Sequence, residues 1–241
     1  MLRRLATSGD AVEVTVGVSG AGKTTVMDAV RELADATDTP IVGAALSGRA
    51  AAELQADAGI PSCTITRLLG ETERSGGLRP GTVLVVDEAA MVGTRHLARL
   101  AALTEQAAGK LILTGDDHQL AEIDAGGLFT ALANRLPGVE LTENVRQHEA
   151  WERQALAELR DGSITKALGM YHRRGRLVVD ATLADTLARA VSDWHTYVTD
   201  TGDLQGALLI AHHNVTVGHL NRAARDHIAA TRAPSRTSAE S

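Results

Sequence analysis

The stretch Gly17-Val18-Ser19-Gly20-Ala21-Gly22-Lys23-Thr24-Thr25 decides how this sequence folds. It has the spacing Gly-x-x-x-x-Gly-Lys-Thr, which is typical of a loop that binds the phosphates of a nucleotide. An apolar alternation over residues 12–16 predicts a strand before the loop, and helical spacing over residues 25–36 predicts a helix after it. The glycines let backbone N–H groups turn toward a phosphate, and the start of a helix favours negative charge. The sequence therefore predicts a nucleoside triphosphate site.

Two side chains of this loop are expected to act directly on the triphosphate. Lys23 is expected to reach the β- and γ-phosphates, and Thr24 to offer its hydroxyl to Mg²⁺. The alternative is a glycine-rich turn before an ordinary helix, but four such positions match by chance in only about one chain in a hundred of this size. The predicted nucleotide-binding residues are Gly17, Gly20, Gly22, Lys23, Thr24 and Thr25.

Composition supports a parallel sheet buried on both faces. Aromatic residues make up only 2% of the 241 residues, so the core must be built from Ala, Val and Leu. The single cysteine, Cys63, excludes an intramolecular disulfide framework and favours a reducing cytoplasm. No apolar run approaches the length of a membrane span. The formal net charge of −6 argues against nonspecific capture of nucleic acid, although a local groove for a single strand is compatible with it.

Strand and helix patterns alternate along the chain. Short runs rich in Val, Ile, Leu and Ala predict strands at 11–16, 41–46, 82–86, 110–114 and 207–211. Helical patterns cover 24–36, 48–57, 94–107, 149–160, 182–199 and 215–229. This alternation predicts an α/β fold with a doubly wound, mostly parallel sheet and helices on both faces. The segment 70–81 is predicted to be an exposed loop, and 230–241 a disordered tail.

A pair of acids follows the apolar strand predicted at 82–86. Asp87 and Glu88 lie at the carboxyl end of that strand, where α/β sheets bind ligands. We expect Asp87 to hold Mg²⁺ together with Thr24, and Glu88 to orient and deprotonate the attacking water. Two adjacent acids are also common as solvated surface charge. Their place after a buried strand, in a chain with a phosphate loop, favours the catalytic interpretation.

Two further polar residues are candidates for the γ-phosphate. Gln119 follows the strand predicted at 110–114 and is expected to reach the γ-phosphate or the attacking water. Arg146 is expected to supply positive charge as the bond to the γ-phosphate breaks. Taken alone, each would more often be an ordinary surface residue. The predicted catalytic residues are Lys23, Glu88, Gln119 and Arg146, with Thr24 and Asp87 as metal ligands.

Read together, these blocks resemble the helicase motifs of superfamily 1, in particular the RecD-like branch. The resemblance extends to the helicase half of TraA- or TrwC-type conjugative relaxases. The matching segments are the loop at 17–25, Asp87–Ala89, Gly115–Leu120 with Gly126 and Gly127, and Arg146-Gln147. Two more segments, 43–51 and 63–69, resemble the DNA-contacting motifs of that family. The resemblance implies a RecA-like domain that uses ATP and Mg²⁺ and acts on single-stranded DNA.

The resemblance also implies a division of the chain. Residues 1–148 are expected to form the ATP-binding motor domain, and 149–229 the beginning of a second one. Later motifs of such helicases, including a γ-phosphate arginine, have no counterpart up to Ser241, so we expect a fragment or truncated product. As a monomer, it is expected to bind MgATP, hydrolyse it slowly and not unwind a duplex.

Three functions are compatible with these motifs. The first is ATP hydrolysis coupled to single-stranded DNA translocation and unwinding. The second is a stand-alone nucleotide-binding ATPase module without helicase activity, which the acidic charge and the scarcity of stacking aromatics favour. A small-molecule kinase is weaker, because Glu88 beside Asp87 is typical of activating water rather than an alcohol. Stimulation of ATP turnover by poly-dT separates the first two.

Overall fold

The computed structural model describes residues 2–18, 21–116, 127–136, 138–141, 147–204 and 206–232. The chain divides between Met170 and Tyr171 into two compact units. The predicted motor-domain boundary at residue 148 stays a prediction, because compactness alone does not define a motor domain. No helix in the described part of the chain is both long and apolar enough to cross a bilayer.

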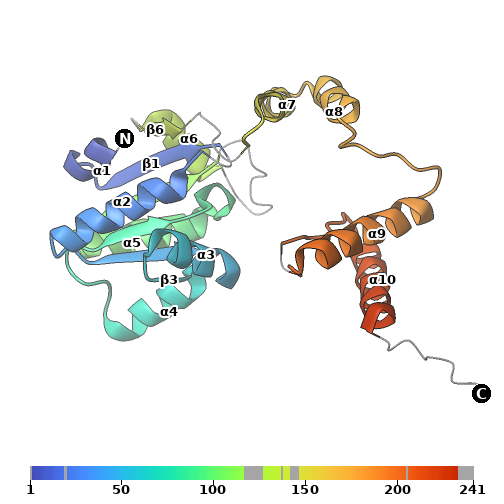
Figure 1. Cartoon of the computed structure of the whole chain (residues 1–241). Coiled ribbons are helices and arrows are strands. Elements are labelled where there is room, and N and C mark those ends of the chain that lie inside the picture. Colours follow the sequence, from blue (N-terminus) through green and yellow to red (C-terminus); the bar gives the residue numbers. More distant parts are fainter. Residues whose placement is uncertain are drawn as a thin grey trace, which may run out of the picture. The chain divides into compact units, whose positions relative to one another are not determined.

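The first unit is built on a parallel sheet. Its described strands are β1 (Val12–Gly17), β2 (Ile41–Ala45), β3 (Ser62–Thr64), β4 (Val83–Val86), β5 (Lys110–Gly115) and β6 (Val139–Leu141). They lie in the order β3-β2-β4-β5-β1-β6, and every neighbouring pair is parallel (Figure 1). Because all strands run the same way, the carboxyl ends of β1, β2, β4 and β5 lie at one edge of the sheet.

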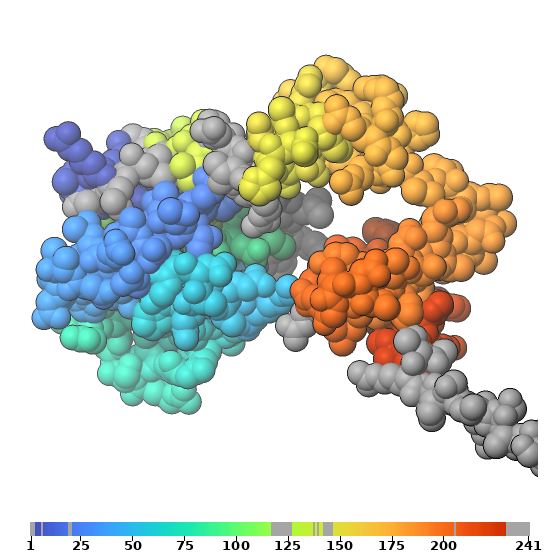
Figure 2. Space-filling model, in the orientation of Figure 1, coloured from blue at the N-terminus to red at the C-terminus, as the bar shows by residue number. Residues whose placement is uncertain are grey.

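Helices cover both faces of this sheet. Successive residues of a strand point to opposite faces, so the strands supply two apolar clusters. One face packs against α4 (Ile65–Ser75), α5 (Thr94–Gln106) and α6 (Leu128–Arg135). The other packs against α1 (Leu2–Thr7), α2 (Lys23–Ala36) and α3 (Gly48–Ala58). Figure 2 shows α2 and α3 lying side by side over this second face. The predicted doubly wound α/β fold is therefore confirmed.

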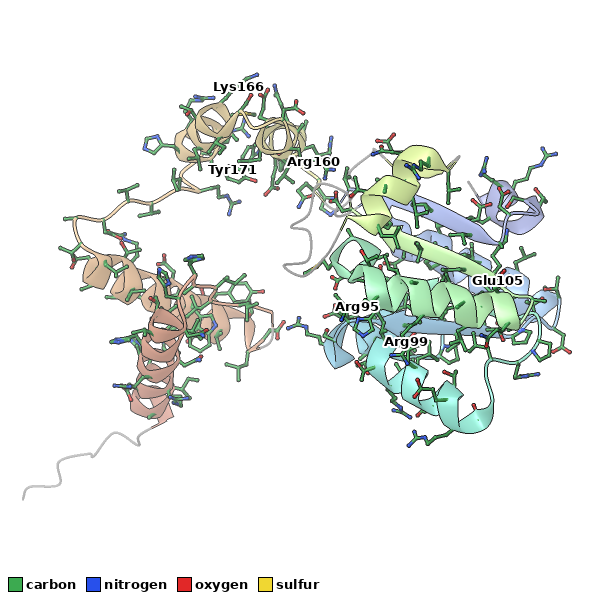
Figure 3. The ribbon with its side chains drawn as sticks, turned by 180° about the vertical axis from the view of Figure 1, so that it is seen from behind. Arg95, Arg99, Glu105, Arg160, Lys166 and Tyr171 are labelled. Carbon is green, nitrogen blue, oxygen red and sulfur yellow. The ribbon has the colours of Figure 1, made fainter. Side chains whose placement is uncertain are left out.

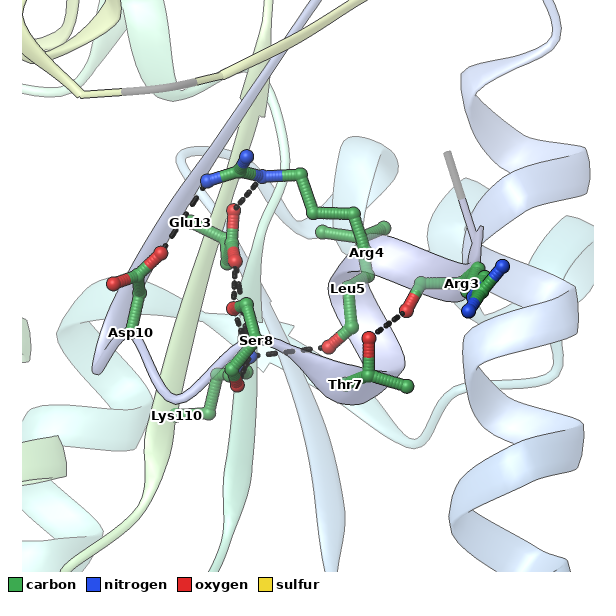
Figure 4. Close-up of polar contacts among 8 residues, drawn as sticks. All are labelled: Arg3, Arg4, Leu5, Thr7, Ser8, Asp10, Glu13 and Lys110. Carbon is green, nitrogen blue, oxygen red and sulfur yellow. Dashed lines mark hydrogen bonds and ion pairs between the residues drawn. The ribbon is translucent and has the colours of Figure 1, made fainter.

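A buried polar cluster ties α1 to the start of β1 (Figure 4). Glu13 is 1% exposed and accepts hydrogen bonds from Arg4 Nε, at 3.4 Å, and from Ser8 Oγ. Lys110, at the start of β5, donates to the carbonyl oxygens of Leu5 and Ser8 at 3.1 and 3.0 Å. A buried carboxylate is tolerated only with such partners. The cluster therefore fixes the start of the strand that leads into the phosphate loop.

Of the remaining described helices, η1 (Ala89–Met91) lies between β4 and α5, and the others follow β6. These others are α7 (Ala150–Arg160), α8 (Ile164–Arg173), α9 (Leu183–Thr201) and α10 (Asn214–Arg232). In the second unit α9 packs against α10, and Trp194 Nε1 donates to the carbonyl oxygen of Ala207 at 3.2 Å. The helices predicted at 149–160, 182–199 and 215–229 are confirmed within a few residues. The predicted disordered tail at 230–241 is wrong for its first three residues, because α10 continues to Arg232; residues 233–241 lie outside the described residues.

Two further local predictions are wrong. Residues 207–211 do not form a strand; Leu208 and Ile210 are 73% and 84% exposed, and the described residues offer this segment no partner strand. A strand needs a neighbour to satisfy its backbone, and an apolar run cannot supply one. The predicted loop at 70–81 is helical up to Ser75, because Leu69 and Thr72 are buried against the sheet. The helix ends where Gly76 adopts a φ of 85°.

Candidate nucleotide-binding site

The phosphate loop connects β1 to α2 as predicted. β1 ends at Gly17 and α2 begins at Lys23, so the strand and helix that the motif requires are both present. Gly22 precedes the helix with a φ of 78°, a conformation that glycine adopts without steric cost. It offers α2 no side-chain cap, so the first turn keeps its N–H groups for another acceptor. The start of α2 is thus suited to an anion.

Lys23 folds back along the loop. Its Nζ donates to the carbonyl oxygens of Gly17 and Val18 at 2.6 and 3.3 Å. A Cβ atom at Gly17 would lie 2.8 Å from Lys23 Cγ, so only glycine leaves room for this side chain. Thr24 is half-buried and Thr25 is exposed in the first turn of α2. Gly20 lies outside the described residues.

The two predicted acids follow β4 at the same edge of the sheet. Asp87 N–H donates to the carbonyl oxygen of Ala44 in β2, at 3.0 Å, and Asp87 Oδ1 accepts from Glu88 N at 2.9 Å. Burial raises the pKa of Asp87 above its usual range, and this increase is partly offset by the hydrogen bond from Glu88 N–H and then by the charge of Lys23. The pKa of Glu88 is also raised, first by burial and then by the neighbouring Asp87. The charge of Lys23 offsets part of the increase in both pKa values, so Lys23 acts electrostatically on both acids.

Glu88 has an unusual backbone conformation. Its φ of 52° lies in the left-handed region, which costs a non-glycine residue about 1–3 kcal/mol. Glu88 precedes η1, and its side chain is exposed rather than packed. Such strain persists where surrounding structure imposes it, and it is concentrated at functional sites.

The donor set is compatible with a magnesium ion. Mg²⁺ prefers oxygen ligands and usually takes one or two carboxylates together with substrate phosphates. Asp87 supplies a partly buried carboxylate, and Thr24 a hydroxyl at the start of α2. A cation would favour the ionised form of Asp87, which burial alone disfavours. No cluster of three or more His, Cys, Asp or Glu side chains occurs among the described residues.

The carboxyl end of β5 completes this edge. A Cβ atom at Gly115 would lie 3.0 Å from both Ala90 N and Phe129 Cζ, so β5 packs closely against the turn after Glu88. Asp116 is 3% exposed and forms two hydrogen bonds of 3.0 Å with Arg160 of α7. The predicted catalytic residues Gln119 and Arg146 lie outside the described residues.

Four further residues, which belong to none of the sequence motifs, make notable contacts or lack a hydrogen bond in the folded chain. Thr15 and Thr114 are fully buried partners in the register of β1 and β5, and their hydroxyls make no hydrogen bond with the described residues. Arg153 Nη1 donates to the carbonyl oxygens of Gln147 and His148, at 2.7 and 2.8 Å, just after Arg146 in the sequence. Arg160 holds Asp116. Their contacts depend on the folded chain, so local sequence cannot indicate them.

The predicted DNA-contacting segments lie on two neighbouring strands. Ser47 follows β2 and accepts a hydrogen bond from Ala50 N at 3.0 Å, as the N-cap of α3. Thr64 ends β3 and accepts from Arg67 N at 3.2 Å, as the N-cap of α4. β2 pairs with β3, so both helix starts lie at the edge that carries the phosphate loop. Arg67 is 69% exposed and its Nε donates to Glu71 at 2.7 Å.

Comparisons with known proteins agree with the predicted resemblance. TraA, a conjugal transfer protein of Agrobacterium fabrum, is 35% identical over 216 residues, which are 89% of this chain and 19% of TraA. The ATP-dependent RecD2 DNA helicase of Deinococcus radiodurans is 34% identical over 145 residues, 58% of this chain and 20% of that protein. The chain thus spans about a fifth of the length of these curated relatives.

Structure and family comparisons point the same way. The Pif1 helicase from Candida albicans superposes with a TM-score of 0.55 at 17% identity, over 81% of this chain and 53% of that one. At this identity the similarity shows the fold, a RecA-like α/β domain. The family model described as an AAA domain matches residues 1–182. The chain therefore belongs to the AAA domain family, with relatives among RecD-like superfamily 1 helicases and TraA-type conjugal transfer proteins.

Proposed function

We propose that this chain binds MgATP at the edge formed by β1, β4 and β5 and hydrolyses it. The observation that carries the proposal is that Lys23, at the start of α2 after β1, and Asp87 and Glu88, directly after β4, lie at the same carboxyl edge of the parallel sheet. The start of α2 and Lys23 receive the phosphates, and Lys23 exchanges its contacts with the loop carbonyls for the β- and γ-phosphate oxygens. Thr24 and Asp87 hold the magnesium ion.

Glu88 is the proposed general base. Its exposed carboxylate and its raised pKa suit a group that accepts a proton from water near neutral pH. Gln119 is proposed to orient that water, and Arg146 to stabilise the charge on the γ-phosphate, each on the motif match alone. Loss of a transition-state arginine in phosphoryl transfer costs about 10³-fold or more in rate.

Single-stranded DNA is the proposed partner. TraA is named for conjugal transfer and RecD2 for ATP-dependent DNA helicase activity, which supports DNA as the substrate of the protein to which this chain corresponds. The two helix starts at Ser47 and Thr64 provide N–H groups suited to backbone phosphates. Exposed arginines on α3 and α4 add positive charge beside them. A cytoplasmic location and a monomeric state stay predictions, the former supported by the single Cys63.

One observation favours the alternative, a nucleotide-binding ATPase without helicase activity. Arg49 is already paired with Glu53 at 2.8 Å, and Arg67 with Glu71 at 2.7 Å. Each arginine would have to leave a carboxylate to bind a phosphate, in a chain of net charge −6. Exposed i,i+4 pairs contribute only about 0.3–0.5 kcal/mol, so breaking each pair costs little. Glu53 and Glu71 would nevertheless remain beside a bound phosphate and repel it, which weakens DNA binding.

The test is ATP turnover by the purified chain with and without poly-dT. The DNA-coupled function predicts faster turnover with poly-dT, whereas the alternative predicts the same rate in both conditions. Glu88→Gln keeps the shape of the side chain but removes the base, so it should bind MgATP while hydrolysis falls roughly 10²-fold or more. Wild-type turnover in Glu88→Gln would contradict the assignment of the base.

A further inference from the structure

Two arginines of helix α7 contact residues that lie close to Gln119 and Arg146 in the sequence, the two candidates for contact with the γ-phosphate. Arg153 and Arg160 lie seven residues apart, which is two helical turns, so they share one face of α7. Arg160 binds Asp116, three residues before Gln119. Arg153 binds the carbonyl oxygens of Gln147 and His148, directly after Arg146. Helix α7 therefore contacts Asp116, which precedes Gln119 in the sequence. It also contacts the backbone just after Arg146.

The contact between Arg160 and Asp116 is well defined. Both Nη atoms of Arg160 donate to Asp116, one to each carboxylate oxygen, at 3.0 Å. A bidentate contact of this kind fixes the relative orientation of the two side chains as well as the distance between them. The Asp116 side chain is 3% exposed and that of Arg160 28%, so solvent competes little for the pair. In Figure 3 Arg160 extends from α7 toward the sheet.

Asp116 is itself anchored to the catalytic edge. It directly follows Gly115, which lies close to the backbone of Ala90 and to the ring of Phe129. Ala90 is two residues from Glu88. A displacement of Asp116 therefore moves the end of β5 against the turn that carries the proposed general base. Packed contacts of this kind transmit small shifts because the interior is dense.

We propose that Arg160 is a positioning residue for ATP hydrolysis, which acts through Asp116 to hold the end of β5 against the turn that carries Glu88. This inference rests on the proposed ATPase function. The contact also links α7 to the proposed nucleotide site, because a displacement of Asp116 on nucleotide binding would be passed to Arg160. A misplacement of about 1 Å in an active site can cost roughly 10²-fold in rate, so loss of Arg160 should lower kcat without removing nucleotide affinity.

The variants separate positioning from folding. Arg160→Ala removes the ion pair with Asp116. Arg160→Lys keeps the positive charge but cannot form the planar bidentate contact. Asp116→Asn removes the charge from the other side, and the double variant Asp116→Asn with Arg160→Ala tests whether the two residues act as a unit. The matched control is Arg189→Ala, because Arg189 also makes a bidentate contact, with Asp180 in the second unit.

Two measurements are needed. The first is steady-state kcat and KM for ATP, with nucleotide affinity measured separately by calorimetry with a non-hydrolysable ATP analogue and Mg²⁺. The second is the fluorescence of Trp151, which lies on α7 and becomes the sole tryptophan when Trp194 is replaced by Phe. The Trp151 signal reports α7 directly, and it needs nucleotide binding but no turnover.

The expected results are specific. With wild-type Arg160, the analogue changes Trp151 emission. In Arg160→Ala the emission change is lost and kcat falls about 10-fold or more, while the affinity for the analogue stays within about twofold. Arg160→Lys folds with near wild-type stability and still shows reduced kcat. The double variant is no slower than the slower single variant, and Arg189→Ala behaves as wild type.

Other results overturn the proposal. Wild-type kcat and an unchanged Trp151 response in both Arg160 variants would show that the pair is only structural. Additive losses in the double variant would show that Arg160 does not act through Asp116. A wild-type chain that binds the analogue but does not hydrolyse ATP would contradict the proposed hydrolysis alone, since the Trp151 response still decides whether α7 is coupled to the site.

Discussion

Thr15 and Thr114 are predicted to destabilise the sheet directly beneath the phosphate loop. Both side chains are 0% exposed, they are register partners on β1 and β5, and neither hydroxyl has a hydrogen-bond partner among the described residues. A buried hydroxyl without a partner costs about 1–3 kcal/mol, whereas an apolar group of the same shape costs nothing comparable. Valine has that shape and is favoured in strands.

We therefore expect Thr15→Val and Thr114→Val each to stabilise the protein by about 1–3 kcal/mol. For a chain of this size, that corresponds to a rise in Tm of about 2–4 °C for each kcal/mol. The assay is urea unfolding followed by circular dichroism, in which the midpoint should rise at constant slope. The control is Thr104→Val, because Thr104 is 2% exposed and its Oγ1 donates to the carbonyl oxygen of Leu100 at 2.8 Å.

The control should lose about 1 kcal/mol, since a satisfied hydrogen bond contributes that much on average. The two groups of variants therefore differ in sign. If Thr15→Val and Thr114→Val lower the midpoint as Thr104→Val does, both hydroxyls are hydrogen-bonded in solution. That result would show that the hydroxyls of Thr15 and Thr114 do not destabilise the folded protein.

Three further predictions concern the site and its surroundings. Asp87→Asn should lose most of its Mg²⁺-dependent gain in ATP affinity while Glu88→Gln retains it, as measured by calorimetry with and without Mg²⁺; equal losses would contradict the division of roles. Gly17→Ala should weaken MgATP binding, because the new Cβ would lie 2.8 Å from Lys23 Cγ and displace that side chain; unchanged affinity would show that the lysine adapts freely. Alkylation of Cys63 by iodoacetamide should have its pH midpoint above that of a cysteine peptide, because burial raises the pKa of this thiol; a midpoint at or below that of the peptide would rule this out.

The sheet could be predicted in large part from sequence because its strands are buried on both faces. Such strands read as continuous apolar runs, and four of the six described strands coincide with predicted runs to within one residue. β3 and β6 are three residues each, too short for a periodic pattern. The run at 207–211 has the same composition as a strand but lacks a partner, and pairing is a property of the whole fold rather than of a segment.

Helix α4 shows a different limit of sequence reasoning. Gly70 and the charged residues around it are typical of a loop, yet the buried side of the helix decides its structure. Leu68 and Leu69 pack into the core with Thr72, while Arg67 and Glu71 pair on the exposed side. Tertiary burial therefore overrides local composition here, as it does for many amphipathic segments.

The shared position of the candidate nucleotide-site residues could be predicted because they follow strand ends. Lys23, Asp87 and Glu88 come from separate motifs, and parallel strands bring them to one edge of the sheet. Arg160 could not be predicted in the same way, because it is 44 residues from Asp116 and lies on a helix with no motif of its own. The left-handed conformation of Glu88 likewise depends on the turn into η1 rather than on the residue type.

The most direct test of the account is the affinity of the purified chain for MgATP, measured by calorimetry for the wild type and for Lys23→Ala. The account predicts saturable binding by the wild type and a large loss of affinity in the variant, because Lys23 is the cation that the loop holds beside the phosphate position. A wild type that binds no MgATP, or a Lys23→Ala variant with wild-type affinity, would contradict the nucleotide site on which the account depends.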